Sequence, residues 1–144
     1  RVSVTRMELY NDQDVLIAVG TDILQINRIE EVLNRLGDRF VQRILTKQEQ
    51  AEYYASKQAS RLLAKRFAAK EAVAKSLGTG IGRGVSWQDI KVYHDENGAP
   101  LVELSGGALE ACLRKGGDSI ALSISDEAEY VLAFAVLWRS ETSI

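Results

Sequence analysis

A chain of 144 residues is long enough for one domain with its own hydrophobic core, so folding requires neither a disulfide nor a structural metal. It carries 18 Lys and Arg against 20 Asp and Glu, a net charge of −2, and its single cysteine, Cys112, excludes an internal disulfide and indicates a buried core residue in a reducing, cytoplasmic compartment. The longest apolar run near the start, residues 15–19, is too short to cross a bilayer, which argues against a membrane protein.

The first part of the chain predicts a leader, a strand and a helix. Residues 1–14 are polar and aperiodic, and we interpret them as a flexible leader or a remnant of expression, which leaves 15–144 as a single domain. Residues 15–20 are typical of a short buried strand. Asp22 is a preferred residue at a helix start, and the helix expected from it ends at Gly37.

Two more helices are expected in the middle of the chain. Thr46 and Glu49 have the spacing of a capping box, which predicts a second helix through about Lys57. Residues 60–77 have the apolar periodicity of a third, longer helix, with alanines on the side opposite its apolar arc. Those alanines would let another element approach closely.

The C-terminal half predicts hairpins around one helix. The dipeptide Asn97-Gly98 is a strong hairpin turn, and Ser105 is a candidate cap for a helix that ends near Lys115. The strands expected around them are residues 90–93, 101–104, 119–125 and 130–138. This order of elements predicts an α+β fold with a mainly antiparallel sheet.

The third expected helix has charges on its apolar side. A helical wheel places Arg66 and Lys70 inside the core-facing arc. A cation there must extend to water, pair with a buried carboxylate or face a bound anion. Two cations one turn apart, with Lys75 one turn beyond Glu71, favour a polyanion site. For Glu71 and Lys75, a surface ion pair is an equally good explanation.

Glycines alternate with other residues directly after this helix, over residues 78–84. The dinucleotide fingerprint has a different glycine spacing and precedes a helix, and a Walker loop needs Gly-Lys-Ser or Gly-Lys-Thr. What remains is a segment that bends sharply and brings backbone N–H groups close to a ligand, or simply a flexible helix exit.

Asp22 and the distribution of charged residues both indicate what the chain could bind. Asp22 either caps a helix or, with Glu71, supplies oxygen ligands for Mg²⁺ while substrate phosphates and water complete the shell. Residues 28–83 hold 12 Lys and Arg against 6 Asp and Glu, which favours an anionic partner, although an ordinary solvated helix surface explains this equally well. Nucleic acid is disfavoured, because the chain is acidic overall and has no basic run with interleaved aromatics.

Four motifs together resemble the holo-[acyl-carrier-protein] synthase family of 4′-phosphopantetheinyl transferases. They are "VGTDI" at 19–23, "RFAAKEAVAKSLGTGIGRG" at 66–84, "NGAP" at 97–100 and "LSISD" at 122–126. The resemblance extends over roughly residues 15–139. It implies transfer of the phosphopantetheine arm of coenzyme A to a serine of an apo acyl carrier protein, with release of adenosine 3′,5′-bisphosphate.

The resemblance also implies residue roles. Asp22 and Glu71 would be the Mg²⁺ ligands, and the catalytic residues would be Glu71, our preferred general base, and Lys75 at the diphosphate. The residues expected to contact coenzyme A are Arg66, Lys70, Lys75, Gly78, Thr79 and Gly80.

Partners follow from the same resemblance. The family is typically homotrimeric, with active sites between neighbouring subunits, and its acyl carrier protein is acidic. Arg28 and Arg39 are the best candidates for docking that partner, ahead of Arg35 and Arg43. Some members carry histidine where this chain has Asp126, so a histidine role is not implied. Asp126 could orient a lysine, contact the metal shell through water or begin a turn, and we expect the turn.

Two other kinds of function are compatible with the sequence. A non-catalytic module would bind coenzyme A or a carrier protein without turnover. A metal-dependent hydrolase would cleave the diphosphate of coenzyme A without any carrier.

Overall fold

One long strand pairing organises the fold. The computed structural model describes residues 2–4 and 14–140. Its main sheet is antiparallel throughout and has four strands, in spatial order β1 (Val2–Val4), β5 (Ser119–Glu127), β6 (Tyr130–Arg139) and β2 (Val15–Gln25). A separate two-stranded hairpin consists of β3 (Ile90–His94) and β4 (Pro100–Leu104). The predicted α+β class with an antiparallel sheet is confirmed.

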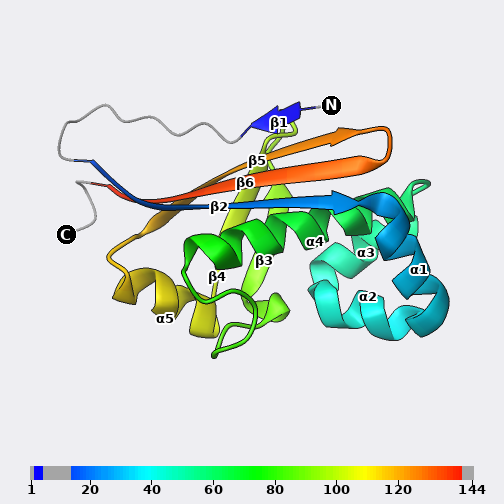
Figure 1. Cartoon of the computed structure of the whole chain (residues 1–144), viewed down its shortest axis with the longest axis horizontal. Helices are drawn as coiled ribbons and strands as arrows, with labels where there is room; N and C mark the ends of the chain where they lie inside the picture. Colours follow the sequence, from blue (N-terminus) through cyan, green and yellow to red (C-terminus); the bar gives the residue numbers. More distant parts are fainter. Residues whose placement is uncertain (1, 5–13, 141–144) are drawn as a thin grey trace.

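The helices lie on one side of the main sheet (Figure 1). In chain order they are α1 (Ile26–Leu36), α2 (Asp38–Ile44), α3 (Lys47–Ala55), α4 (Ala59–Ser76), a 3₁₀ turn η1 (Trp87–Asp89) and α5 (Gly106–Arg114). The long helix α4 runs alongside β2 and β6, with α1, α2 and α3 gathered near its first half and α5 at the opposite end (Figure 1). Among the described residues, no helix is long and apolar enough to span a bilayer.

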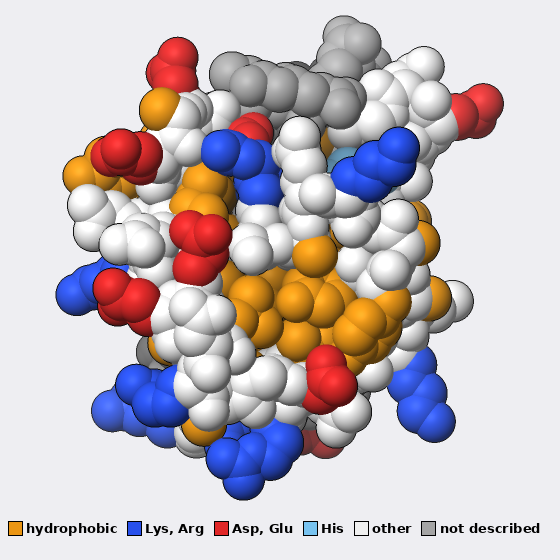
Figure 2. Space-filling view, turned by 90° about the vertical axis from the view of Figure 1, so that its right-hand side faces the viewer, with side chains coloured by type: hydrophobic (Ala, Val, Ile, Leu, Met, Phe, Trp, Pro, Cys, Tyr) orange, Lys and Arg blue, Asp and Glu red, His pale blue; other side chains and the backbone are white. Residues whose placement is uncertain are grey.

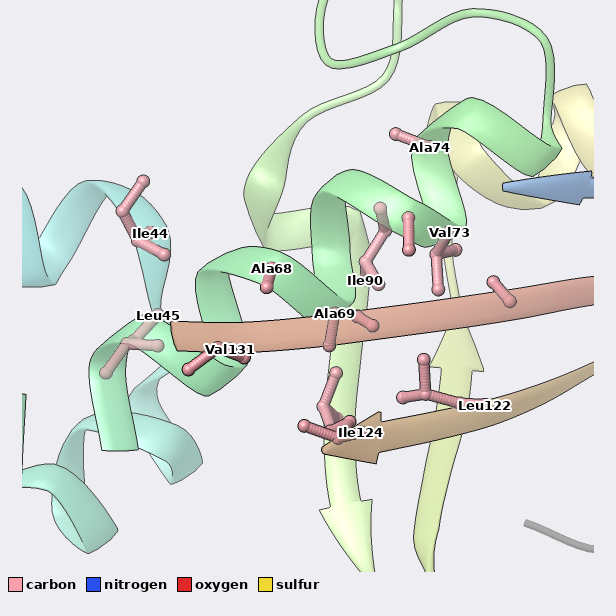
Figure 3. Packing of buried hydrophobic residues seen from close by; sticks show 14 of the residues in the cluster. Ile44, Leu45, Ala68, Ala69, Val73, Ala74, Ile90, Leu122, Ile124 and Val131 are labelled. Carbon is pink, nitrogen blue, oxygen red and sulfur yellow. The ribbon is translucent and has the colours of Figure 1, made fainter. Parts of the chain in front are cut away.

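Small residues let α4 approach the sheet closely. The predicted alanine side is buried, with Ala68, Ala69 and Ala72 inaccessible to solvent. Figure 3 shows α4 side chains, including Ala69 and Val73, packed beside the strand that carries Val131. Such tight packing makes α4 a rigid support for whatever its exposed side carries.

Several local sequence signals correctly predicted where elements begin or end. Gly37 ends α1 with a φ of 60°, and the Thr46–Glu49 capping box is complete at the start of α3. The hairpin at Asn97-Gly98 is also confirmed, with Gly98 at a φ of 83°. At Ser105 the chain does enter a helix, but the serine side chain makes no capping hydrogen bond.

Two expectations were wrong, and two elements of the structure were not predicted. Asp22 lies inside β2, paired with Ala133, and α1 begins at Ile26, because pairing with β6 extends the strand past the local cap signal. Asp126 lies in β5, where it pairs with Val131, and does not begin a turn. Helix α2 and the turn η1 were not predicted. The flexible leader does not describe Val2–Val4, which form β1, and its residues 5–13 lie outside the described residues.

Candidate active site

Strand β2 and helix α4 touch through their backbones beside the predicted metal ligands. A Cβ atom on Gly20 would collide with the carbonyl oxygen of Ala72 and would lie 2.6 Å from the amide nitrogen of Ser76. Because side chains of residues i and i+2 share one face of a strand, this contact turns Asp22 toward α4. Glycine at position 20 thus sets the distance between the two elements that carry the site.

Asp22 and Lys75 form the observed link across this contact. The Nζ atom of Lys75 donates to Oδ1 of Asp22 at 3.1 Å and to the carbonyl oxygen of Thr21 at 2.9 Å. An ammonium group has three donors, so one N–H of Lys75 remains for a ligand. The lysine is half-exposed, and therefore accessible to an anion from solvent.

Glu71 lies close enough to Asp22 for the two carboxylates to repel each other. Partial burial raises the pKa of Glu71, the negative charge of Asp22 raises it further, and Lys75 opposes the shift. The negative charge of Asp22 disfavours ionisation of Glu71, and a divalent cation bound between them would relieve this. Asp22 and Glu71, which are 49 residues apart in the sequence, thus lie near enough in the fold for one charge to act on the other.

The two carboxylates would suit magnesium better than zinc. Among residues 14–140, no group of three or more His, Cys, Asp and Glu could enclose an ion. Mg²⁺ typically takes one or two carboxylates and completes its octahedron with water and substrate phosphates. The two partly buried carboxylates would therefore suit Mg²⁺ better than zinc, which prefers closed nitrogen and sulfur sites.

Lys70 occupies a different place from the one expected of a phosphate-binding residue. Its side chain is 0 % exposed, and Nζ donates to the carbonyl oxygen of Ile44 at 2.7 Å, to Oε1 of Glu49 at 2.7 Å and to the carbonyl oxygen of Trp87 at 3.1 Å. All three donors are used inside the protein. The buried-carboxylate alternative therefore describes Lys70, and a direct contact with coenzyme A does not fit this geometry.

Glu49 is the partner that sequence analysis did not connect with Lys70. Besides Lys70, it accepts from the backbone amides of Thr46 at 2.8 Å and Val92 at 2.9 Å. It is also 0 % exposed, and so joins α3, α4 and β3 within the core. The capping-box spacing predicted the contact with Thr46, but no local signal indicates a lysine 21 residues away.

Arg66 is buried but lines a hollow. Its Nη2 atom donates to Oε2 of Glu52 at 2.9 Å and lies 3.4 Å from Nδ1 of His94, while Nη1 lies 4.0 Å from Oε2 of Glu49. Nη1 has no hydrogen-bond partner among the described residues. Unlike Lys70, Arg66 thus has one buried donor without a hydrogen bond, on the side that faces Glu49.

The hollow beside Arg66 has a volume of about 380 Å³ and a basic wall. Its lining residues are Ser56, Gln58, Arg61, Leu62, Lys65, Arg66, His94, Gly98 and Ile124. They include three cations and no carboxylate. Sequence analysis had not singled out Arg61, Lys65 or His94 as site residues, because α4 and the β3–β4 hairpin meet here only in the folded chain.

Asp126 holds two of these cations. Arg61 donates to its Oδ2 at 3.0 Å, and Nζ of Lys65 lies 3.8 Å from its Oδ1. Asp126 thus bridges β5 to α4 and partly neutralises the basic wall.

A second hollow of about 580 Å³ lies next to Arg61, between the start of α1 and the start of α4. Neither hollow is lined by Asp22 or Glu71.

The glycine segment leaves α4 beside Lys75. Gly78 and Gly80 have φ angles of 80° and 63°, which favour glycine over residues with a Cβ atom. A Cβ on Gly78 would lie 2.7 Å from Nζ of Lys115, a cation that sequence analysis did not connect with this loop. The hydroxyl of Thr79 donates to the carbonyl oxygen of Gly80 at 2.8 Å, so the turn is internally braced.

The candidate docking arginines lie on two consecutive helices. Arg28 and Arg35 on α1 and Arg39 and Arg43 on α2 are all exposed. Figure 2 views the side of the molecule on which these helices lie and shows Lys and Arg side chains gathered at its lower edge, near an exposed hydrophobic area.

Two neighbouring carboxylates, a lysine with a free N–H and a basic hollow are together typical of proteins that bind phosphate esters. The chain matches the family model of the 4′-phosphopantetheinyl transferase superfamily over residues 18–135, and it belongs to that superfamily. It is 57 % identical over 122 residues to the holo-[acyl-carrier-protein] synthase of Shewanella amazonensis, which covers 85 % of this chain and 98 % of the relative.

Solved structures agree in fold. The chain is similar to the crystal structure of holo-[acyl-carrier-protein] synthase from Neisseria meningitidis, with a TM-score of 0.80, 39 % identity and coverage of 85 % of this chain and 98 % of that one. The Helicobacter pylori holo-[acyl-carrier-protein] synthase in complex with coenzyme A matches with a TM-score of 0.73 at 34 % identity, over 83 % of this chain and 98 % of that one.

Proposed function

We propose that this chain transfers 4′-phosphopantetheine from coenzyme A to a serine of an apo acyl carrier protein, in a Mg²⁺-dependent reaction that serves fatty acid biosynthesis. The products are the holo carrier protein and adenosine 3′,5′-bisphosphate. The observation that carries this proposal is the neighbourhood of Asp22 and Glu71 across the β2–α4 contact, with Lys75 bonded to Asp22. Similarity to named holo-[acyl-carrier-protein] synthases supports it.

The site residues would divide the reaction as follows. The serine oxygen attacks the phosphorus that bears the pantetheine arm, the bond from that phosphorus to the bridging diphosphate oxygen breaks, and the nucleotide leaves with that oxygen. Glu71 takes the serine proton, a task that its raised pKa favours. The free N–H of Lys75 stabilises the charge that develops on the leaving phosphate.

Asp22 and Glu71 would hold Mg²⁺, whose charge would neutralise the diphosphate. The glycine turn at Gly78 and Gly80, with Thr79 between them, would let the nucleotide approach the backbone beside Lys75.

Arg66 would bind a phosphate other than the diphosphate. It precedes Glu71 by five residues on α4, or about 7.5 Å along the helix axis. Its hollow is lined by neither predicted metal ligand. Coenzyme A carries one phosphate on its ribose, separate from the diphosphate, and this group suits the basic wall.

A mass measurement tests the transferase proposal. We expect the protein, incubated with apo carrier protein, coenzyme A and Mg²⁺, to increase the carrier mass by one phosphopantetheine group. Unchanged carrier mass at high protein concentration, with coenzyme A bound, would instead establish a binding module. Cleavage of coenzyme A in the absence of carrier would establish a hydrolase.

Charge reversal on α1 should weaken carrier docking. Arg28 is exposed and lies on the helix that follows β2, so we expect Arg28→Glu to raise the apparent KM for an acidic carrier protein about tenfold at low salt and to leave coenzyme A binding unchanged. Arg39→Glu should act in the same direction. Steady-state kinetics with each substrate varied in turn measures this, and an equal loss for both substrates contradicts the division of surfaces.

We also propose that the protein is a homotrimer and that it is located in the cytoplasm. The outer face of the main sheet exposes apolar side chains in facing pairs: Ile23 is opposite Leu132, and both are about half-exposed or more. Phe134, two residues further along β6, is exposed on the same face. Further copies of the chain would cover this surface. A monomer mass by light scattering at micromolar concentration contradicts the trimer.

A further inference from the structure

We infer that Glu52 is a displaceable carboxylate that occupies Arg66 in the free protein and competes with the ribose phosphate of coenzyme A for this guanidinium. The inference rests on the proposed function and adds a residue that limits the affinity of the same site. Glu52 belongs to α3, four residues before Ser56, which lines the hollow. Its Oε2 accepts from Nη2 of Arg66 at 2.9 Å.

The two carboxylates near Arg66 differ in their freedom to move. Glu49 has a side chain that is 1 % exposed and is held by Thr46, Lys70 and Val92. The side chain of Glu52 is 49 % exposed, and Arg66 is its partner on the protein. Rotation of Glu52 into water therefore costs little, because its oxygens exchange one charged donor for solvent. Glu49 has no such alternative and remains in place.

The local charges favour an anion over Glu52. Lys70 balances Glu49, and the single carboxylate of Asp126 is shared between Arg61 and Lys65, so with Arg66 the four cations exceed the two fixed carboxylates by two charges. Glu52, bonded to Arg66, offsets one of these two charges and leaves the hollow with a net positive charge. A phosphate carries at least one full charge and accepts from several donors at once, among them Arg66 and the remaining cations of the wall. Phosphate and Glu52 are thus alternative partners for the same Nη2 atom.

Replacing Glu52 by glutamine tests this competition. In Glu52→Gln the side-chain oxygen still accepts from Arg66, but the negative charge is gone. We expect isothermal titration with coenzyme A to show affinity about two- to fivefold higher than in the wild type, because solvent around the half-exposed Glu52 screens the charge that is removed. The gain should shrink at high salt. It should also vanish with 3′-dephospho-coenzyme A, which lacks the ribose phosphate, and in kinetics it should lower the KM for coenzyme A rather than change kcat.

Glu110→Gln is the matched control. Glu110 is exposed on α5 and lies outside the hollow, and its substitution makes the same change in net charge. Equal coenzyme A affinities of Glu52→Gln and Glu110→Gln would overturn the inference, as would an equal gain with the dephosphorylated ligand. If the wild type binds no coenzyme A at all, the proposed function fails and the inference fails with it.

Discussion

Glu71→Gln and Asp22→Asn should each lower turnover by at least about a thousandfold while the protein stays folded. Each substitution removes one of the two carboxylates that the β2–α4 contact brings together, and an amide is a poor ligand for Mg²⁺. Glu71→Gln also removes the proposed base, and a lost general base alone typically costs a hundredfold or more. The carrier-mass assay at saturating substrates measures the loss.

The pH dependence of stability gives this prediction an independent control. The pKa of Glu71 is raised above 4.5 in the folded protein, so between 4.5 and the raised value the folded state binds more protons than the unfolded state. Stability attributable to this group is therefore present below pH 4.5 and lost as the pH rises through the folded-state pKa. Without metal, Glu71→Gln should be at least as stable as the wild type at pH 7, and the two should converge toward pH 4.

The opposite pattern would point to a structural role. If Glu71→Gln and Asp22→Asn unfold at markedly lower denaturant concentrations than the wild type, their lost activity reflects a damaged fold. Added Mg²⁺ provides one more distinction. It should raise the melting temperature of the wild type by mass action and leave that of either variant nearly unchanged.

Local signals in the sequence predicted the scaffold of the site better than its electrostatics. The capping box of α3, the glycine that ends α1 and the apolar periodicity of α4 each depend on residues within one or two turns, and each prediction was confirmed. At Asp22 the local signal failed: aspartate before an apolar helical pattern indicates a cap, but ten residues of pairing with β6 keep the chain extended. Long-range pairing outweighed local preference there.

The partners of the buried charges were beyond sequence analysis for the same reason. The helical wheel correctly located Arg66 and Lys70 on the core side of α4 and gave three alternatives for them. Which alternative applies depends on Glu49 and Glu52, and on the position of α3 beside α4. No period or spacing in one sequence gives that position. The two cations differ in their partners. Lys70 pairs with the buried carboxylate of Glu49, whereas Arg66 pairs with the half-exposed Glu52 beside a hollow.

Lys70→Met should destabilise the protein by about 3–5 kcal/mol, because it removes the close partner of the buried Glu49 and leaves only Nη1 of Arg66, 4.0 Å away, to balance that charge. Burial lowers the pKa of Lys70, Glu49 raises it, and Arg66 lowers it again. The ammonium thus depends on Glu49 for its charge in the core. Urea unfolding followed by circular dichroism measures the loss. The double variant Lys70→Met/Glu49→Gln should recover part of it, because the remaining amide is neutral and its oxygen still accepts from Thr46 or Val92.

Measurements of coenzyme A binding distinguish a structural role of Lys70, as the partner of Glu49, from direct contact between Lys70 and a phosphate. Under conditions where Lys70→Met is folded, its affinity for coenzyme A should stay within about twofold of the wild type, whereas Arg66→Met should lose tenfold or more, since charge-assisted bonds to phosphate are worth more than neutral ones. A Lys70→Met protein of wild-type stability and much weaker coenzyme A binding would contradict the buried pair. It would show that Lys70 leaves Glu49 to reach the ligand, at the cost of stranding a carboxylate with no exposed surface.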